Sequence, residues 1–297
     1  MPSLTEMADL EPIKMLLYGR SGVGKTGSLA SLAAAGYQLR IIDTDNGLPV
    51  LRNLILHPKS PYPPACLANI QAVTFTDSMR TANGNIVPAQ ARAWSQAVAM
   101  LDRWKDGAMD LGPVKNWGHT DILVLDTLSS LTTAALNFIQ ALNGRLGEGT
   151  SGFKGQRDIG ETQARIESLL QMLSDRAIKC NVIVMAHIVF STELGGRPRA
   201  QTDDKGQVVG VDDYSGLPAT IGRALGPKIP QYFNTALELR TVGEGPGARK
   251  WLYTKTQGPT ELKNTTPFGV EDRYPIATGL ADYFKAVHGP LPKEPKP

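Results

Sequence analysis

Residues 19–26 read Gly19-Arg20-Ser21-Gly22-Val23-Gly24-Lys25-Thr26, and Gly27 follows them. The spacing G-x-x-x-x-G-K-[ST] is typical of a loop whose glycines let the backbone wrap a polyphosphate, with its N–H groups pointing inward. An apolar run leads into the stretch and a helix-forming run follows it. We therefore predict that residues 19–27 bind the phosphates of a nucleotide, that Lys25 reaches the β- and γ-phosphates, and that Thr26 binds Mg²⁺. The alternative is an ordinary glycine turn.

Short apolar runs, each ended by polar or glycine residues, recur along the chain. They cover residues 13–18, 39–43, 70–75, 122–125 and 182–185. Runs of this length are typical of buried strands, and especially of parallel ones. Helical spacing of apolar residues separates them, at residues 25–35, 89–104 and 166–177. Strands that alternate with helices predict an α/β fold with a mainly parallel central sheet and helices on both faces.

The C-terminal part of the sequence predicts an antiparallel edge to this sheet. Residues 236–240 and 251–254 alternate between apolar and polar side chains on either side of a glycine-rich turn, which indicates a hairpin. A further helix is predicted near residues 279–288.

Breaker-rich segments set the expected boundaries of the domain. Residues 191–234 contain seven glycines and four prolines, which predicts either a functional mobile loop or disorder. We assign residues 12–288 to one domain that includes this loop, residues 1–11 to an N-terminal extension, and residues 289–297 to a disordered tail.

Asp126 ends the apolar run at residues 122–125. An aspartate at the carboxyl end of a buried parallel strand lies where open α/β sheets bind their ligands. We predict that Asp126 holds Mg²⁺ through water, as the second carboxylate part of the phosphate-loop site. The alternative is a helix cap, which the following Thr127 and Ser129 would support.

Asp43 and Asp45 follow the strand predicted at residues 39–43. Hydrolysis needs a carboxylate that orients or deprotonates the attacking water, and either residue could supply it. We prefer Asp45. The alternative is that both aspartates serve the turn at Asn46-Gly47, which their residue type also suits.

His187 follows the strand predicted at residues 182–185. A histidine at the mouth of the sheet, next to a nucleotide, can contact the γ-phosphate and report its presence to the loop that follows. The alternative is a hydrogen-bonded histidine of the core.

The composition predicts a soluble protein. The chain has 31 basic and 28 acidic residues, a net charge of +3, and 41% of its residues are hydrophobic. No apolar run approaches the roughly 20 residues that span a bilayer, and the N-terminus lacks the pattern of a secretory signal. Two cysteines, Cys66 and Cys180, are too few for a disulfide framework. We therefore expect a cytoplasmic protein with no membrane partner.

The order of these features resembles the RecA-like ATPase core: phosphate loop, strand followed by acid, strand ending in Asp126, strand with a polar end, loop, hairpin. More narrowly, it resembles the phage-encoded AAA-family ATPases related to single-strand annealing proteins of the Sak type. The resemblance implies an ATP- and Mg²⁺-dependent hydrolase that forms a ring or filament and acts on single-stranded DNA in recombination, annealing or replication. It also implies single-strand-binding or other recombination proteins as partners, and the host cytoplasm as location if a phage encodes the protein.

The resemblance carries over to individual residues. Asp45 matches the catalytic acid of the family, where RecA-like proteins usually have Glu, and His187 matches a position where RecA has Gln. Residues 191–226 correspond to the loop that touches single-stranded DNA in RecA. Lys263, near Pro267-Phe268, looks like the RecA segment that offers lysines to a neighbouring subunit's nucleotide. We therefore expect Lys263 to act as a cation in trans, the alternative being a solvated loop lysine.

Direct sequence support for DNA binding is thinner. The segment 191–234 carries five acidic and five basic residues, so it is neutral. The basic ones are Arg197, Arg199, Lys205, Arg223 and Lys228. Three aromatic residues could stack on bases, the alternative being packing in the core or on the surface: Phe190, Tyr214 and Tyr232. Residues 221–297 have 11 basic and 7 acidic side chains, so the positive excess lies in the last quarter of the chain.

Two other functions remain open from the sequence. A nucleotide-gated interaction or loader protein with negligible hydrolysis is favoured by the short side chain of Asp45. A small-molecule kinase of the phosphate-loop class fits less well, because its lid is often rich in arginine and the 191–234 segment is neutral.

Overall fold

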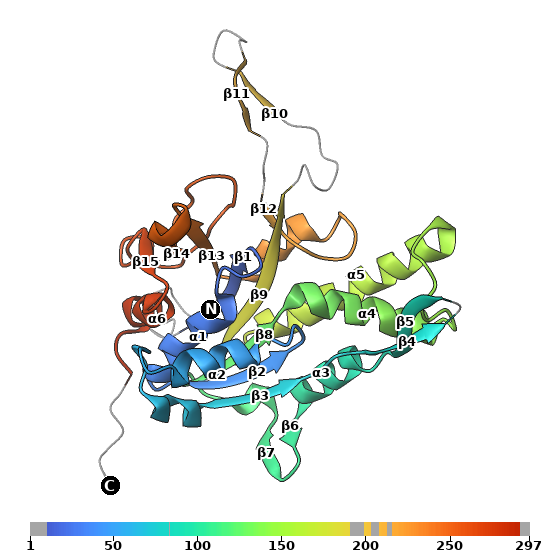
Figure 1. Cartoon of the computed structure of the whole chain (residues 1–297), viewed down its shortest axis with the longest axis horizontal. Coiled ribbons are helices and arrows are strands. Elements are labelled where there is room, and N and C mark those ends of the chain that lie inside the picture. The colour runs from blue at the N-terminus through green and yellow to red at the C-terminus, as the bar shows by residue number, and fades with distance from the viewer. Residues whose placement is uncertain (1–10, 83, 191–198, 203–207, 213–215, 292–297) are drawn as a thin grey trace, which may run out of the picture.

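A nine-stranded sheet runs through the centre of the molecule, with helices on both faces (Figure 1). The computed structural model describes residues 11–82, 84–190, 199–202, 208–212 and 216–291. The sheet follows the order β15-β14-β13-β1-β9-β8-β2-β3, and β12 pairs with β9 outside this path. Its strands are β1 (Lys14–Gly19), β2 (Gln38–Asp43), β3 (Ile70–Thr74), β8 (Asp121–Asp126), β9 (Asn181–Phe190), β12 (Gly216–Pro218), β13 (Thr235–Val242), β14 (Arg249–Tyr253) and β15 (Arg273–Pro275).

The centre of the sheet is parallel and one of its edges is antiparallel. All pairings from β13 through β1, β9, β8 and β2 to β3 are parallel, whereas β14 and β15 add antiparallel strands at the C-terminal edge. The RecA-like α/β fold and its C-terminal hairpin are therefore confirmed. The hairpin gains a third strand, β15, that the sequence did not predict.

The register of the sheet brings the predicted site residues to one edge. Gly19 of β1 lies opposite His187 of β9, and Asp43 of β2 lies opposite Asp126 of β8. Because parallel strands end at the same edge, the loops that follow these four strands meet there.

Two hydrophobic cores lie on opposite faces of the sheet. Leu16 and Tyr18 of β1 contribute to one core, while the alternate residues Met15 and Leu17 contribute to the other. The first core packs against α3, α4 and α5, and the second against α1, α2 and α6. The helices are α1 (Lys25–Ala34), α2 (Leu48–Leu56), α3 (Ala93–Asp102), α4 (Leu128–Leu142), α5 (Gly152–Ser174) and α6 (Gly279–His288).

Two predicted helices have different bounds in the structure. The pattern at residues 89–104 runs past the end of α3, since Trp104 instead opens the small hairpin of β6 (Trp104–Asp106) and β7 (Met109–Gly112). The Trp104 ring is buried beside Trp117, with ring centroids 5.6 Å apart. The stripe at residues 166–177 marks only the second half of α5, and Ala177 lies beyond its end.

The segment 191–234, predicted as one loop, contains regular structure. β10 (Arg199–Thr202) and β11 (Val208–Asp212) pair antiparallel and project from the body of the molecule (Figure 1). β12 returns the chain to β9, and the 3₁₀ turn Gly226–Tyr232 packs under α5, where the Tyr232 hydroxyl donates to Glu167 at 2.7 Å. Residues from 216 onward thus belong to the packed domain. The predictions for the N-terminal extension, the end of the tail, Arg197, Lys205 and Tyr214 lie outside the described residues.

Another hairpin, β4 (Ser78–Ala82) with β5 (Asn85–Gln90), follows β3 and was not predicted.

No helix in the described part of the chain is long and apolar enough to cross a membrane.

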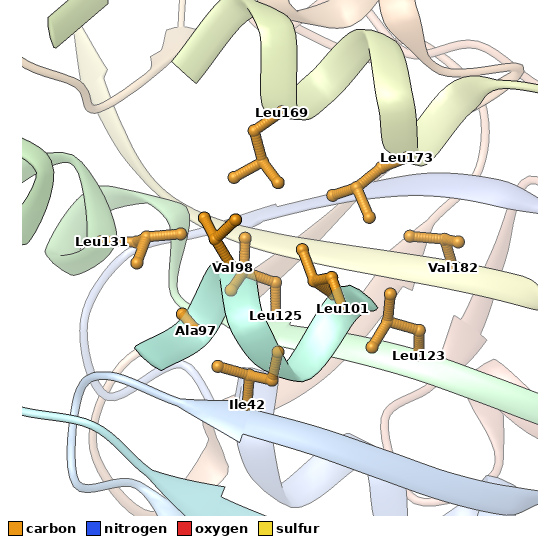
Figure 2. Close-up of a pocket in the computed structure, with 10 residues that line it drawn as sticks. All are labelled: Ile42, Ala97, Val98, Leu101, Leu123, Leu125, Leu131, Leu169, Leu173 and Val182. Atoms are coloured by element: carbon orange, nitrogen blue, oxygen red, sulfur yellow. The ribbon is translucent and has the colours of Figure 1, made fainter. Parts of the chain in front are cut away.

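An apolar seam between α3, α5 and the sheet shows how tightly the first core is packed (Figure 2). Its residual space is about 10 Å³, which is at the lower limit of what one water molecule needs. The seam therefore has no room for a ligand. Ten side chains line it: Ile42, Ala97, Val98, Leu101, Leu123, Leu125, Leu131, Leu169, Leu173 and Val182.

Replacing Leu173 by Ala should lower the free energy of unfolding by about 3 kcal/mol, because it opens a cavity in this seam. Urea unfolding followed by circular dichroism measures the change. Met172→Ala is the matched control, since Met172 is 40% exposed on the same helix and should cost less than about 1 kcal/mol. Equal losses in the two variants would contradict the packing described here.

Candidate nucleotide-binding site

The phosphate loop connects the end of β1 to the start of α1. Gly22 and Gly24 have φ angles of 74° and 107°, in the left-handed region that favours glycine. Gly24 is the N-cap of α1, and having no side chain it leaves the first backbone N–H groups of the helix open. A helix N-terminus of this kind attracts anions through its N–H groups and its dipole.

Lys25 is buried at the centre of this loop. Its Nζ donates to the carbonyl oxygens of Gly19 at 2.8 Å and Arg20 at 3.2 Å, and lies 3.1 Å from Nδ1 of His187. Burial lowers the pKa of the Lys25 ammonium, while the negative charges of Asp126 and Asp45 oppose that shift. The ammonium is thus held by weak carbonyl acceptors beside two carboxylates.

Thr26 and Asp126 form a direct pair across the loop. The Thr26 hydroxyl donates to Oδ2 of Asp126 at 2.5 Å. Burial raises the pKa of the Asp126 carboxyl to about 6; the bond from Thr26 and the charge of Lys25 lower it, whereas Asp43 and Asp45 raise it further. The buried negative charge of Asp126 lies beside two other carboxylates and has too little positive charge near it. A divalent cation would supply that positive charge.

The same pair fits a magnesium site in which the nucleotide supplies further ligands. Mg²⁺ usually keeps several waters and takes only one or two carboxylates from the protein, with phosphates completing its shell. Within the described ranges, no group of three or more His, Cys, Asp or Glu is placed to hold a metal by itself. The helix-cap alternative for Asp126 does not apply, because Thr127 caps α4 by accepting from the Ser130 N–H at 3.3 Å.

Gly47 closes the site from the side of α2 and was missed by the sequence analysis. A Cβ at this position would lie 2.8 Å from the Thr26 hydroxyl and 3.3 Å from Oδ2 of Asp126. Only glycine leaves room for that pair. The signal was present in Asn46-Gly47, which the pattern indicated only as a turn.

Asp43 and Asp45 have different surroundings. Asp43 is buried, and its Oδ1 accepts the N–H groups of Asp45 at 2.9 Å and Gly47 at 3.2 Å, while Oδ2 accepts from the Thr74 hydroxyl. Asp45 is partly exposed, with Oδ1 accepting from the Ser130 hydroxyl at 3.0 Å. Asp43 therefore builds the turn, and Asp45 presents its carboxylate at the mouth of the site.

His187 connects Asp45 to Lys25. Its Nε2 lies 3.2 Å from Oδ2 of Asp45, and its backbone N–H donates to the Ser129 hydroxyl at 3.0 Å. Because the Lys25 ammonium only donates, Nδ1 of His187 accepts and Nε2 carries the proton that is donated to Asp45. The strand does not end at this histidine as predicted, since β9 continues to Phe190.

Two further lysines of the C-terminal part occupy different places. Lys263 pairs through its backbone with Ala236, and its Nζ donates to the Phe233 carbonyl at 2.8 Å, before the start of β13. The hydrogen bonds of Lys263 within the described part of the chain go to Phe233 and Ala236 and not to the phosphate loop. Lys250 of β14, which the sequence analysis did not single out, donates from Nζ to the Gly22 carbonyl at 2.9 Å.

The fold and the site together define a P-loop ATPase with a RecA-like core. A family model described as an AAA domain matches residues 11–257, and the chain therefore belongs to that family. No curated protein sequence matches the chain significantly.

Similar solved structures share little sequence with the chain. They include the RadB recombinase, at 14% identity over 91% of this chain and 90% of that one, with a TM-score of 0.44. The KaiC-like protein PH0186 from Pyrococcus horikoshii OT3 is 12% identical over 91% and 88%, with a TM-score of 0.40. The flagellar accessory protein FlaH from Methanocaldococcus jannaschii is 8% identical over 91% and 88%, with a TM-score of 0.40.

Replacing Asp126 by Asn should raise the free energy of unfolding of the nucleotide- and metal-free protein by about 2 kcal/mol at about pH 8. The amide keeps an acceptor for Thr26 but removes a buried charge that the neighbouring carboxylates repel. The folded-state pKa of about 6 exceeds the ordinary 3.8, so the wild type regains this stability as the pH falls through 6. The difference between the proteins should therefore shrink toward about pH 4.

Urea unfolding in EDTA at the two pH values measures this difference. Asp43→Asn is the control, because the Asp43 carboxylate already accepts two backbone N–H groups and its amide should bring no gain. An Asp126→Asn variant less stable than the wild type at the higher pH would contradict the electrostatic account.

Proposed function

We propose that the protein is a Mg²⁺-dependent ATPase in which Asp45 orients and deprotonates the attacking water. The observation that carries this proposal is the chain of contacts Lys25–His187–Asp45–Ser130, which runs from the phosphate loop to a carboxylate at the mouth of the site. Such a chain supports the proposal because it would hold a general base beside the position that a γ-phosphate would take.

The residues of the site have separate roles in the proposed hydrolysis. Lys25 and the open N–H groups of α1 bind the β- and γ-phosphates, since the carbonyl acceptors of Lys25 are weaker than phosphate oxygens. Thr26 and Asp126 would hold Mg²⁺, and the bound ion would supply positive charge toward the phosphates. Ser130 and His187 fix the two oxygens of Asp45.

The reaction is a transfer of the γ-phosphoryl group to water. The water oxygen forms a bond to the γ-phosphorus, the bond from that phosphorus to the β–γ bridging oxygen breaks, and Asp45 takes the water's proton. The products are ADP and inorganic phosphate. Release of phosphate frees Lys25 to return to the carbonyls of Gly19 and Arg20.

His187 is suited to transmit the state of the nucleotide. It touches both Lys25 and Asp45, so a shift of Lys25 toward a phosphate changes the contacts of the histidine. β9 carries this residue and leads into the segment of β10 and β11, which projects from the domain (Figure 1). We propose that this segment contacts single-stranded DNA in a phage-type recombination, annealing or replication complex, as the resemblance of the sequence implies.

Assembly into a ring or filament belongs to the same proposal. An oligomer would add up the few basic residues of each copy along one DNA strand, and would allow Lys263 to reach the nucleotide of a neighbour. Single-strand-binding or other recombination proteins are the expected partners.

A second candidate is a nucleotide-gated loader with negligible hydrolysis. Both oxygens of Asp45 are already engaged, by Ser130 and His187, and its side chain is short. Each of these oxygens keeps a further acceptor position, so the two contacts are compatible with either candidate. Steady-state phosphate release distinguishes the two candidates.

Asp45→Asn should lower kcat for phosphate release by about 100-fold or more, while the Kd for ATP stays within about threefold, because only the general base is lost. Asp43→Asn is the matched control. Its amide oxygen still accepts the N–H groups of Asp45 and Gly47, so most of the activity should remain. A larger loss in Asp43→Asn than in Asp45→Asn would reverse the assignment of the base.

DNA binding and assembly are tested together by size analysis and fluorescence anisotropy with a labelled oligonucleotide, with and without an ATP analogue. We expect larger particles and tighter DNA binding with the analogue.

Lys263→Ala should reduce phosphate release by about tenfold or more in the assembled state and leave the nucleotide-bound monomer folded. Absence of DNA binding in both states would remove the DNA part of the proposal, and full activity of Lys263→Ala would remove its role in trans.

A further inference from the structure

Lys250 reaches the phosphate loop from a part of the chain that the loop motif does not include. It lies on β14, opposite Thr241 of β13, and 228 residues separate it from Gly22. Because side chains alternate along a strand, Lys250 shares its face with Leu252, which is buried in the core that contains α1 and α6. Its ammonium therefore reaches the side of the sheet on which the loop and α1 lie.

A second residue of the same region supports the neighbouring part of the loop. The Ile276 N–H donates to the Lys250 carbonyl at 3.1 Å, which ties the residue after β15 to β14. The Ile276 side chain lies so close to Gly24 that a Cβ there would come within 2.9 Å of its Cδ1. Lys250 and Ile276 thus form a brace, by which we mean the contacts of these two residues with Gly22 and Gly24.

The contact of Lys250 has a consequence for the direction of a neighbouring N–H group. The peptide bond between Gly22 and Val23 is planar, so its carbonyl oxygen and its N–H group point in opposite directions. Lys250 holds the oxygen on the side of the loop that faces β14. The Val23 N–H is thereby directed across the loop, where it donates to the Arg20 carbonyl over a long 3.4 Å.

We infer that Lys250 is a positioning residue of the phosphate loop, which holds the Gly22 carbonyl outward so that the Val23 N–H is available to a polyphosphate. Gly22 has a left-handed conformation, and glycine lets such a peptide turn over easily. Fixing the peptide before the ligand arrives removes an ordering penalty from binding. This role rests on the proposed function, because it concerns the same nucleotide site.

If Lys250 positions the loop in this way, nucleotide affinity depends on its N–H donor and not on its charge. Lys250→Met removes the donor at similar length, and Lys250→Gln keeps an N–H donor without the charge. Lys255→Met is the matched control, because Lys255 follows the same strand but pairs with Asp272. Lys250 is exposed, so these variants should fold, which thermal melting checks.

Binding of a fluorescent ATP analogue and steady-state phosphate release provide the first readout. Lys250→Met should raise Kd and KM by about five- to tenfold with kcat within about twofold, since a pre-formed loop stabilises ground state and transition state alike. Lys250→Gln should recover most of the affinity and Lys255→Met should match the wild type. A Gln variant as weak as the Met variant, or a Met variant that binds normally, would overturn the inference.

Hydrogen exchange of the peptide covering residues 19–27, in the nucleotide-free protein, provides a readout that does not depend on hydrolysis. Exchange in Lys250→Met should be several-fold faster than in the wild type, and Lys250→Gln should restore the slower rate. Unchanged exchange would overturn the positioning role even if the ATPase proposal holds. Conversely, a wild type that exchanges as expected but releases no phosphate would contradict the ATPase proposal and leave the role of Lys250 in place.

Discussion

The site depends on the parallel register of four strands. Gly19 lies opposite His187 and Asp43 opposite Asp126, so three strands bring a polar side chain to the edge of the sheet where the fourth, β1, leads into the phosphate loop. A slip of one residue in either pairing would turn those side chains to the other face of the sheet. The two hydrophobic cores oppose such a slip, because β1 packs Leu16 into one core and Leu17 into the other, and a shift would break the packing of both. Packing of the cores thus keeps β1 and β9 in the register that brings the start of the phosphate loop opposite His187.

Much of this architecture could be predicted because it follows from local patterns. The five apolar runs and the glycine loop each lie within a few residues of sequence, and strands with two buried faces are apolar throughout. Elements without such a pattern were missed. The first half of α5, from Gly152, is largely polar and has no apolar stripe. α2 begins at Leu48-Pro49, directly after the Asn46-Gly47 turn, and the sequence pattern indicated only that turn. The hairpin of β4 and β5 is mostly exposed, so its residues alternate weakly.

The roles of the site residues depended on contacts that the sequence does not display. Asp43 and Asp45 are of one type and two positions apart, yet the turn uses the first through its backbone N–H groups and leaves the second exposed. Only glycine fits at position 47, because a Cβ there would lie too close to Thr26, and Lys250 reaches the loop by a contact over 228 residues. Neither relation has a local signature. The positive excess of the last quarter of the sequence was visible, but only the structure places one of its lysines on the phosphate loop.

Three carboxylates, Asp43, Asp45 and Asp126, meet one buried ammonium, Lys25, and the fold treats the three charges differently. Asp43 is stabilised by two backbone N–H groups and the Thr74 hydroxyl, and Asp45 by solvent, Ser130 and His187. Asp126 is buried and has a side-chain donor, Thr26, in place of backbone N–H groups. Its pKa is raised to about 6, because burial and the two other carboxylates outweigh the effects of Thr26 and Lys25. A divalent cation therefore gains most at Asp126, beside Thr26 and away from the turn that Asp43 builds. The carboxylate that destabilises the ligand-free protein is the one to which the proposed function assigns the cation, so under that proposal the stability of this site and its chemistry oppose each other.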